Sequence, residues 1–153
     1  MSPLIGVWHE TVDRLTPVQQ AERAGFLDLP PTRDAHAGAH AQVRAFRQIE
    51  LQQPTGAPAA GPLRVAAWNL ERCYNVEKSA AVLRREGAEL VLLSEVDNGM
   101  ARTGQRHTSR DVAAELGMNY AFGVEFLELE LGAEVELEFC KDDFNRHGFH
   151  LDV

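Results

Sequence analysis

The sequence predicts an α/β fold, and two apolar segments carry most of that prediction. Residues 63–69 and 90–95 each have the pattern of a buried strand that ends in a polar, oxygen-bearing side chain. The segment between them has helical spacing, so the predicted order is strand, helix, strand. The chain has 153 residues, of which 44% are hydrophobic, and this is enough for one ordinary domain with a core.

Residues 1–53 are predicted to form a helical N-terminal extension. Residues 16–19 fit a capping box with proline at the first helical position, and Gly25 is placed to end that helix. A second helix is expected over about residues 34–51, where apolar residues recur at helical spacing. Residues 54–62 are rich in proline, alanine and glycine, so they predict a linker to a globular part over residues 63–153.

The globular part is predicted to begin with a βαβ unit. Residues 65–68 are short and include valine and tryptophan, which suits a strand, and residues 77–86 carry an apolar helical stripe that stops before Gly87. Residues 90–93 are continuously apolar, as in a strand that is covered on both faces. If the two strands are parallel and share a sheet, the crossover between them is expected to be right-handed.

A further helix, a strand and an acidic stretch complete the predicted elements. Residues 108–117 begin with a hydroxyl cap and end at Gly117, which predicts a helix, and residues 119–126 predict the next strand. In residues 127–139, apolar residues alternate with glutamates on both sides of a glycine, which predicts an exposed hairpin with its carboxylates outward. That face is either a cation-binding surface or, more simply, a solvated strand face.

The formal net charge of -8 is concentrated in one place. Six of the 23 acidic residues are glutamates within residues 125–138, and the rest of the chain has 17 acids against 15 bases. Because the acid is local, charge does not exclude a phosphate-bearing partner such as a nucleic acid. Cys73 and Cys140 cannot form a disulfide framework, and there is no signal peptide and no run of about 18 apolar residues. We expect a cytoplasmic protein without a membrane span.

Asn69 and Glu95 are the candidate site residues, because each follows a predicted strand. The carboxyl ends of parallel strands open onto one crevice, so groups placed there can meet. Mg²⁺ prefers oxygen ligands and keeps several waters, so one or two carboxylates suffice to bind it. Glu95 meets that description, and the Asn69 amide can accept from or donate to a carboxylate, a water or a phosphate oxygen. The simpler interpretation of each residue is a capping or surface side chain.

These residues carry a resemblance to a known family. Residues 64–70, Arg-Val-Ala-Ala-Trp-Asn-Leu, followed by residues 90–96, Leu-Val-Leu-Leu-Ser-Glu-Val, are similar to the first two motifs of the endonuclease/exonuclease/phosphatase superfamily. That family includes type I deoxyribonucleases, abasic-site endonucleases, inositol-phosphate phosphatases and sphingomyelinases. The similarity covers about residues 63–126, with a fainter echo in residues 145–150.

The resemblance implies a four-layered α/β sandwich, of which this chain is the N-terminal part. It also implies hydrolysis of a phosphoester with Mg²⁺ or Mn²⁺, with Glu95 as the metal ligand and Asn69 positioning the metal or the phosphate. The chemistry would be in-line attack of water on phosphorus, with the ion stabilising the developing charge. The substrate class is open, since members act on DNA, sugar phosphates and lipids.

The later motifs of the family are not found in this sequence. They supply an Asp-x-Asn pair, a further Asp and a terminal element with a catalytic His, whereas residues 142–145, Asp-Asp-Phe-Asn, match in neither spacing nor surroundings. We therefore expect a truncated phosphoester hydrolase that is inactive and poorly soluble as an isolated chain. The alternative is a non-enzymatic remnant or interaction module, in which the N-terminal helices and the acidic stretch bind a partner and the old site is idle.

The arginines and histidines have weaker patterns. Arg102 and Arg106 follow Glu95 on the side where the strands end, so either could contact a substrate phosphate through its fork of N–H groups; a solvent-exposed loop arginine is the simpler interpretation. Other residues have metal-like spacing but lack a complete ligand set, and the simpler interpretation is a surface or loop residue. These are His36 with His40, and Cys140 with His147 and His150; His107 precedes a predicted helix and is expected to be a polar loop residue.

Overall fold

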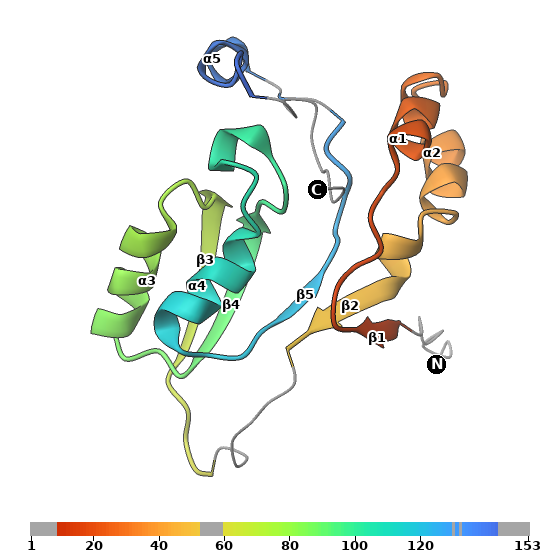
Figure 1. Cartoon of the computed structure of the whole chain (residues 1–153). Helices are drawn as coiled ribbons and strands as arrows, with labels where there is room; N and C mark the ends of the chain where they lie inside the picture. Colours follow the sequence, from red (N-terminus) through yellow and green to blue (C-terminus); the bar gives the residue numbers. More distant parts are fainter. Residues whose placement is uncertain (1–8, 53–59, 130, 132, 144–153) are drawn as a thin grey trace.

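The fold is a mixed α/β arrangement, seen here in a computed structural model that describes residues 9–52, 60–129, 131 and 133–143. In this described part the chain forms five α-helices and two small sheets (Figure 1). The predicted α/β class is therefore confirmed at that level. None of the helices in the described part is both long and apolar enough to cross a membrane.

The first sheet belongs to the predicted βαβ unit. Strands β3 (Val65–Arg72) and β4 (Leu90–Val96) are parallel, and α3 (Val76–Arg85) connects them. After β4 come a short 3-10 helix, η2 (Ala101–Thr103), and α4 (Thr108–Leu116). Helices α3 and α4 lie together on one side of the sheet (Figure 1).

A core fills the space between this sheet and its helices. Its buried members are Cys73, Val76, Leu83 and Val112, and the inward side chains of β3 and β4 pack against them. The other face of the sheet is open: Leu90 is 43% exposed and Leu92 is 57% exposed. The prediction that residues 90–93 are covered on both faces is therefore wrong, because helices pack on one face alone.

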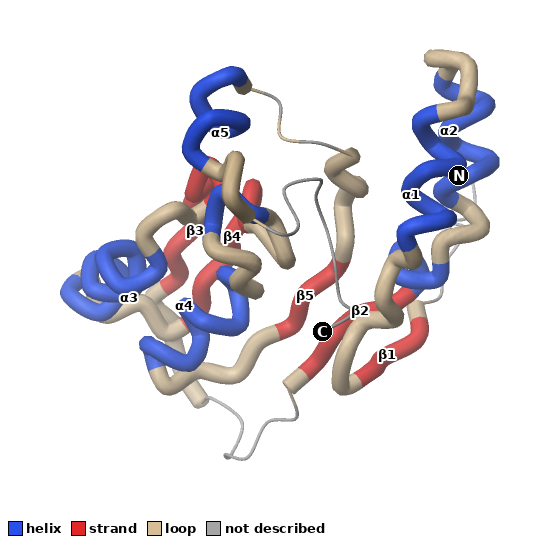
Figure 2. The backbone as a smooth tube through the Cα atoms, turned by 45° about the horizontal axis from the view of Figure 1, so that its top comes forward, coloured by secondary structure: helices blue, strands red, loops and turns tan. Residues whose placement is uncertain are grey.

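The second sheet joins the N-terminal region to the strand after α4. Strand β1 (Glu10–Val12) pairs parallel with β2 (Gln48–Leu51), and β2 pairs antiparallel with β5 (Ala121–Gly123). Figure 2 shows these strands side by side and apart from β3 and β4. Strand β5 is shorter than the predicted strand over residues 119–126.

Between β1 and β2 the chain forms two helices and a 3-10 turn. Helices α1 (Gln20–Leu27) and α2 (Arg33–His40) precede η1 (Arg44–Arg47). The capping box is present one turn later than predicted, on Gln19 and Glu22, and Gly25 lies inside α1 instead of ending it. The imidazole rings of the predicted helical histidines pack against aromatic rings of this region.

The predicted helix over residues 34–51 is wrong in its second half, where β2 forms. Gln48 and Glu50 point into the protein and are buried, at 2% and 3% exposure. Gln48 accepts a hydrogen bond from the backbone N–H of Thr16, and Glu50 accepts one from the backbone N–H of Leu15. These buried polar partners come from distant chain positions, so the apolar spacing of the segment could not reveal the strand.

The predicted acidic hairpin is also wrong. Residues 134–139 form α5 (Glu134–Phe139), and residues 124–129 are not in a strand. Leu131 is buried with Met100, while Glu128 and Glu136 contact the buried Arg102, so the glutamates do not all face solvent. A period-two pattern can occur in a segment whose charged side chains pair inside the protein. In this segment, the ion pairs of Glu128 and Glu136 with Arg102 stabilise a conformation other than a hairpin.

Candidate functional site

Asn69 and Glu95 meet at the carboxyl ends of β3 and β4. Asn69 stands opposite Ser94 in the parallel register, and the next residue of β4 is Glu95. The Asn69 Nδ2 group donates a hydrogen bond of 2.7 Å to Glu95 Oε1. The Asn69 Oδ1 atom accepts from the backbone N–H of Glu71 at 3.0 Å. Each end of the amide therefore has one partner, and the hydrogen bond from Nδ2 orients the Glu95 carboxylate.

The backbone at this site is strained. Four of the five non-glycine residues with positive φ in the described part lie at these two strand ends: Glu71 at 42°, Arg72 at 77°, Cys73 at 61° and Glu95 at 51°. A side chain in the left-handed region costs roughly 1 kcal/mol or more, so the surrounding packing must hold it. Cys73 is 2% exposed within the core, which fixes the end of β3.

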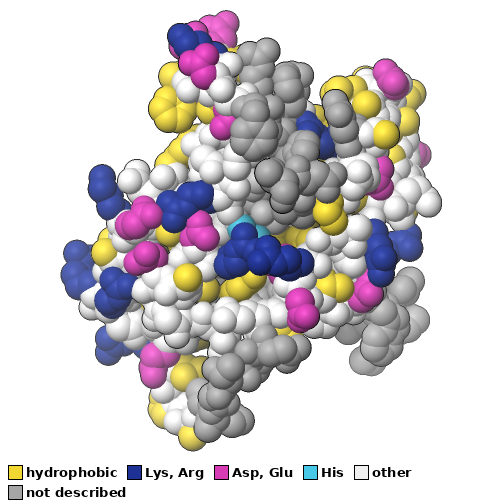
Figure 3. Space-filling view, in the orientation of Figure 1, with side chains coloured by type: hydrophobic (Ala, Val, Ile, Leu, Met, Phe, Trp, Pro, Cys, Tyr) yellow, Lys and Arg dark blue, Asp and Glu magenta, His cyan; other side chains and the backbone are white. Residues whose placement is uncertain are grey.

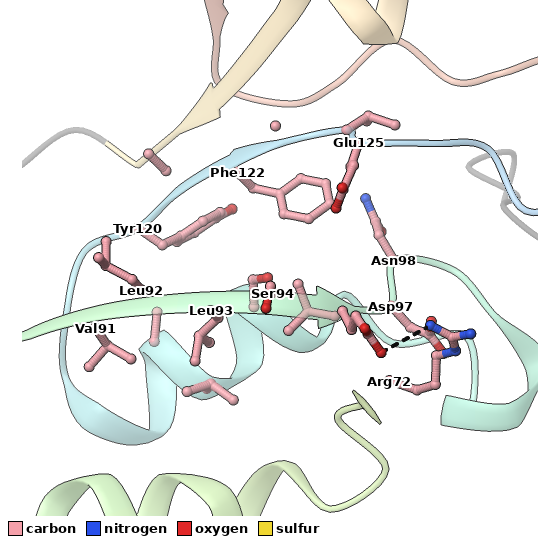
Figure 4. Close-up of a pocket in the computed structure, with 18 of the residues that line it drawn as sticks. Arg72, Val91, Leu92, Leu93, Ser94, Asp97, Asn98, Tyr120, Phe122 and Glu125 are labelled. Carbon is pink, nitrogen blue, oxygen red and sulfur yellow. Dashed lines mark ion pairs between the residues drawn. The ribbon is translucent and has the colours of Figure 1, made fainter. Parts of the chain in front are cut away.

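Arg72 is the cation of the site, and it is not among the candidate residues predicted from the sequence. Its Nη1 atom lies 3.6 Å from Glu95 Oε2, and this ion pair is drawn in Figure 4. The Arg72 side chain is 29% exposed and that of Glu95 is 42% exposed, so solvent and small solutes reach both groups. The signal that could have found Arg72 is its position three residues after Asn69, at the end of the same strand.

Arg102 does not point to Glu95. Its guanidinium is 2% exposed and makes two hydrogen bonds to Asp97, of 2.9 and 2.8 Å, and two to Glu128, of 3.0 and 3.1 Å. Burial alone would lower the pKa of Arg102, but the hydrogen bonds to these carboxylates raise it above its ordinary value. A substrate phosphate would have to displace a carboxylate to reach this side chain.

Among the described residues, the other candidates predicted from the sequence have structural partners or are buried. Arg106 pairs with Glu77 and Asp111. Cys73 and Cys140 are buried free thiols, and burial raises the pKa of both. No group of three metal-ligating side chains occurs among the described residues, whereas His147 and His150 lie outside them, as do residues 145–150 of the family echo.

His107 is buried beside a carboxylate and is not the polar loop residue that was expected. It caps α4 by accepting the Arg110 backbone N–H at Nδ1, which leaves the proton on Nε2. That Nε2 atom lies 3.2 Å from Glu50 Oε1, to which the Tyr120 hydroxyl also donates at 2.6 Å. The cluster of Glu50, His107 and Tyr120 joins the N-terminal region to the βαβ unit.

A hollow of about 730 Å³ adjoins the candidate site. It lies between β4, α4 and the segment around β5, and Arg72 and Glu95 are among the residues that line it. Figure 4 shows Tyr120 and Phe122 on one side of this hollow and the side chains of β4 on the other.

Comparison with known proteins gives no relative of this chain. No protein-family model, curated protein or solved structure matches the chain. The chemistry of the site therefore rests on the residues themselves.

A divalent cation such as Mg²⁺ needs oxygen ligands, and two side chains at this site carry oxygen donors. Glu95 offers a partly exposed carboxylate with one oxygen held only by a 3.6 Å contact, so it can serve as a single protein ligand to a hydrated Mg²⁺ or Mn²⁺. The Asn69 Oδ1 atom already accepts one backbone N–H, so it keeps one lone pair and is the weaker of the two oxygen donors. The residues therefore fit a weak site in which Glu95 is the main protein ligand.

Proposed function

We propose that this chain carries part of the site of a Mg²⁺- or Mn²⁺-dependent phosphoester hydrolase of the endonuclease/exonuclease/phosphatase type. The observation that supports the proposal best is the 2.7 Å hydrogen bond by which Asn69 orients Glu95 at the ends of two parallel strands. Clustered backbone strain at the same place is a second support, because strained residues gather at functional sites.

Each side chain has a distinct role in this proposal. Glu95 would hold the metal, and Asn69 is a positioning residue that engages Oε1 of the carboxylate, while Oε2 lies 3.6 Å from Arg72 Nη1. When bound, the ion would polarise a phosphoryl oxygen and stabilise the leaving oxygen. Arg72 is paired with Glu95, and its N–H groups would be offered to the phosphate when the metal takes that carboxylate. The partner is a phosphoester, and the site itself does not select among nucleic acid, sugar phosphate and lipid.

The chain on its own is proposed to bind metal without turnover. One carboxylate and one arginine supply binding and charge, but hydrolysis also requires a group that removes a proton from water. His107 does not fill this role, because its imidazole is 4% exposed and both ring nitrogens face protein groups. A further segment would have to bring a base to Glu95.

The test is a titration of the protein with Mn²⁺, in which electron paramagnetic resonance measures the fraction of the ion that is bound. The wild type should bind one Mn²⁺ weakly, Glu95→Gln should weaken binding at least tenfold, and Asn69→Ala should weaken it several-fold. Glu115→Gln is the matched control, since Glu115 is a half-exposed glutamate on α4 that is paired with Arg84, and it should bind as the wild type does. Equal binding by the Glu95 and Glu115 variants would contradict the proposed site.

Activity is measured separately with bis(4-nitrophenyl) phosphate and Mg²⁺. The isolated chain should hydrolyse it no faster than buffer does. Turnover that is abolished by EDTA and by Glu95→Gln would overturn the proposed inactivity while supporting the assignment of the site.

The second candidate function is an interaction module with an idle site. It is favoured by the hollow beside β4, whose shape and open strand edges do not depend on metal.

A further inference from the structure

The hollow beside β4 is a groove that follows the edge of a strand. We call it the β4 groove; it is lined by residues 72, 89–98 and 116–128, together with parts of α4 and of the N-terminal region. Side chains from both faces of β4 line it: Leu93 lies on the face that packs on α4, and Leu92 lies on the open face. Because residues of both faces of β4 line this space, it passes along the edge of the strand.

Both strands that border the groove have an unpaired edge. Among the described strands, β4 pairs with β3 alone, and β5 pairs with β2 alone at the end of its sheet. An unpaired edge presents a row of backbone N–H and C=O groups to any extended chain that approaches it. The groove thus has hydrogen-bonding backbone on two sides, which suits an extended peptide better than a compact solute.

A buried side-chain donor also lacks a partner at this place. Asn98, just after β4, is 9% exposed, and its Nδ2 group has no hydrogen-bond partner among the described residues. Asn98 lines the groove, and its amide extends toward the segment after β5 (Figure 4). A buried amide N–H without a partner costs about 1 to 3 kcal/mol, so a ligand carbonyl placed there would be favoured.

The side chains that line the groove indicate which side chains a bound peptide should carry. Leu92 and Phe122 form apolar walls, which suit aliphatic side chains at alternate positions of an extended peptide. Five carboxylates line the groove, and Arg72 is the one cation among the lining residues. Asp97 and Glu128 are paired with the buried Arg102, whereas the other three are Glu89, Glu95 and Glu125. The charge at the rim therefore favours a basic peptide.

We propose that the β4 groove binds an extended segment of a partner protein that alternates aliphatic and basic residues. The segment adds a strand to β4, places its aliphatic side chains against Leu92 and Phe122, and accepts the Asn98 Nδ2 hydrogen. Its lysines or arginines lie at the acidic rim. The proposal goes beyond the proposed hydrolase site and does not require Glu95 to bind metal.

The test uses the full chain and a fluorescein-labelled peptide in which lysine and valine alternate over 7 residues, the length of β4. Fluorescence anisotropy should show saturable binding that weakens as salt is added. Replacing the central valine with proline should weaken binding at least tenfold, because proline removes a backbone donor and does not fit inside a sheet. Glutamate in place of every lysine should weaken it at least as much.

Two protein variants locate the peptide. Leu92→Gln removes an apolar wall at an exposed position, so folding is retained and affinity should fall about tenfold. Leu137→Gln is the matched control, since Leu137 is an exposed leucine of α5 that is not among the residues lining the groove, and its affinity should be unchanged. Asn98→Ala should weaken binding about threefold to tenfold.

Hydrogen exchange supplies an independent readout of strand addition. Peptide binding should slow the exchange of backbone amides in both β4 and β5, whereas amides of α3 should be unaffected. Equal affinity of the valine and proline peptides, or unchanged affinity of Leu92→Gln, would overturn the proposal. So would a dimer in sedimentation that the peptide fails to dissociate, because a second copy of this chain would then be the occupant.

Discussion

At the scale of single residues, Glu50 is a buried carboxylate that connects distant parts of the chain. It is 3% exposed and receives the Leu15 backbone N–H at 2.9 Å and the Tyr120 hydroxyl at 2.6 Å, with His107 at 3.2 Å. Burial raises the pKa of Glu50, but the contacts with His107, Tyr120 and Leu15 outweigh burial and lower the pKa to about 2 from its ordinary 4.5. As the pH falls, Glu50 is therefore protonated at a higher pH in the unfolded chain than in the folded chain.

Glu50→Gln is expected to lower the free energy of unfolding by about 2 to 3 kcal/mol at neutral pH, because charge-assisted hydrogen bonds to a buried carboxylate are lost. The stabilisation by Glu50 is fully present above its unfolded pKa and is lost as the pH falls from 4.5 toward about 2. Urea denaturation at several pH values gives the free energy of unfolding of the wild type and of Glu50→Gln. The two values should converge as the pH falls over this range.

The control for this change is Glu77→Gln. Glu77 forms an exposed ion pair with Arg106, which solvent screens, so the free energy of unfolding of Glu77→Gln should stay close to that of the wild type. A constant difference between wild type and Glu50→Gln down to pH 2 would contradict the role given to Glu50.

At the scale of elements, helix ends follow local rules where a glycine is required. Gly117 follows α4 with φ of 67°, the left-handed conformation that favours glycine, and the predicted end of that helix is confirmed. Gly25 was predicted to end a helix but lies inside α1, where a glycine is not needed. A Cβ atom added at either glycine would meet no atom within 4 Å.

These two glycines make a matched pair for substitution. Gly117→Ala should lower the free energy of unfolding by about 1 kcal/mol, because alanine is strained at positive φ. Gly25→Ala should raise it by about 0.5 to 1 kcal/mol, because alanine favours the helix and restricts the unfolded chain. Thermal and urea denaturation should show the opposite signs; equal signs would contradict the conformations assigned here.

The acidic segment is an element that long-range contacts decide. Arg102 binds Glu128 and Glu136 from it and Asp97 from the loop after β4, so one buried guanidinium ties three parts of the chain together. Tyr74 adds a 2.6 Å hydrogen bond to Glu136, and this contact contributes, after burial, to raising the pKa of Tyr74 to about 12. The local alternation of apolar residues and glutamates carries no record of these partners.

At the scale of the whole molecule, the βαβ unit has one covered and one open sheet face. Val65 and Leu90 are register neighbours on the open face and are 54% and 43% exposed. Exposed apolar sheet surface with unpaired edges is prone to association. On the face of the molecule drawn in Figure 3, acidic and basic side chains are interspersed, so charge repulsion of one sign does not dominate there.

The double substitution Val65→Thr with Leu90→Thr is expected to reduce self-association at high concentration without changing the fold. Threonine is β-branched, as valine is, and suits a strand at both positions while it removes apolar surface. Sedimentation velocity should show less of the associated species, and circular dichroism should be unchanged. Leu137→Thr on α5 is the control and should associate as the wild type does; equal association of all three proteins would contradict an interface at this face.

Local periodicity was enough to predict the βαβ unit and its flanking helix. Strands β3 and β4, helices α3 and α4 and the glycine that ends α4 all follow from apolar spacing and cap residues, which act within a few positions of the chain. The placement of Asn69 and Glu95 at adjacent strand ends follows from the same pattern, since parallel neighbours open at one edge.

The sequence by itself therefore determined the βαβ unit and the meeting of Asn69 with Glu95. Tertiary structure alone decided β2, the fate of the acidic segment, the burial of Arg102 and the position of Arg72. The physical reason is that each of these features depends on at least one charged or hydrogen-bonding partner far along the chain, such as Leu15 for Glu50, 35 positions away, and Glu128 for Arg102, 26 positions away. Such partners leave no periodic signal, because a buried polar side chain is stabilised by what it contacts and not by its spacing.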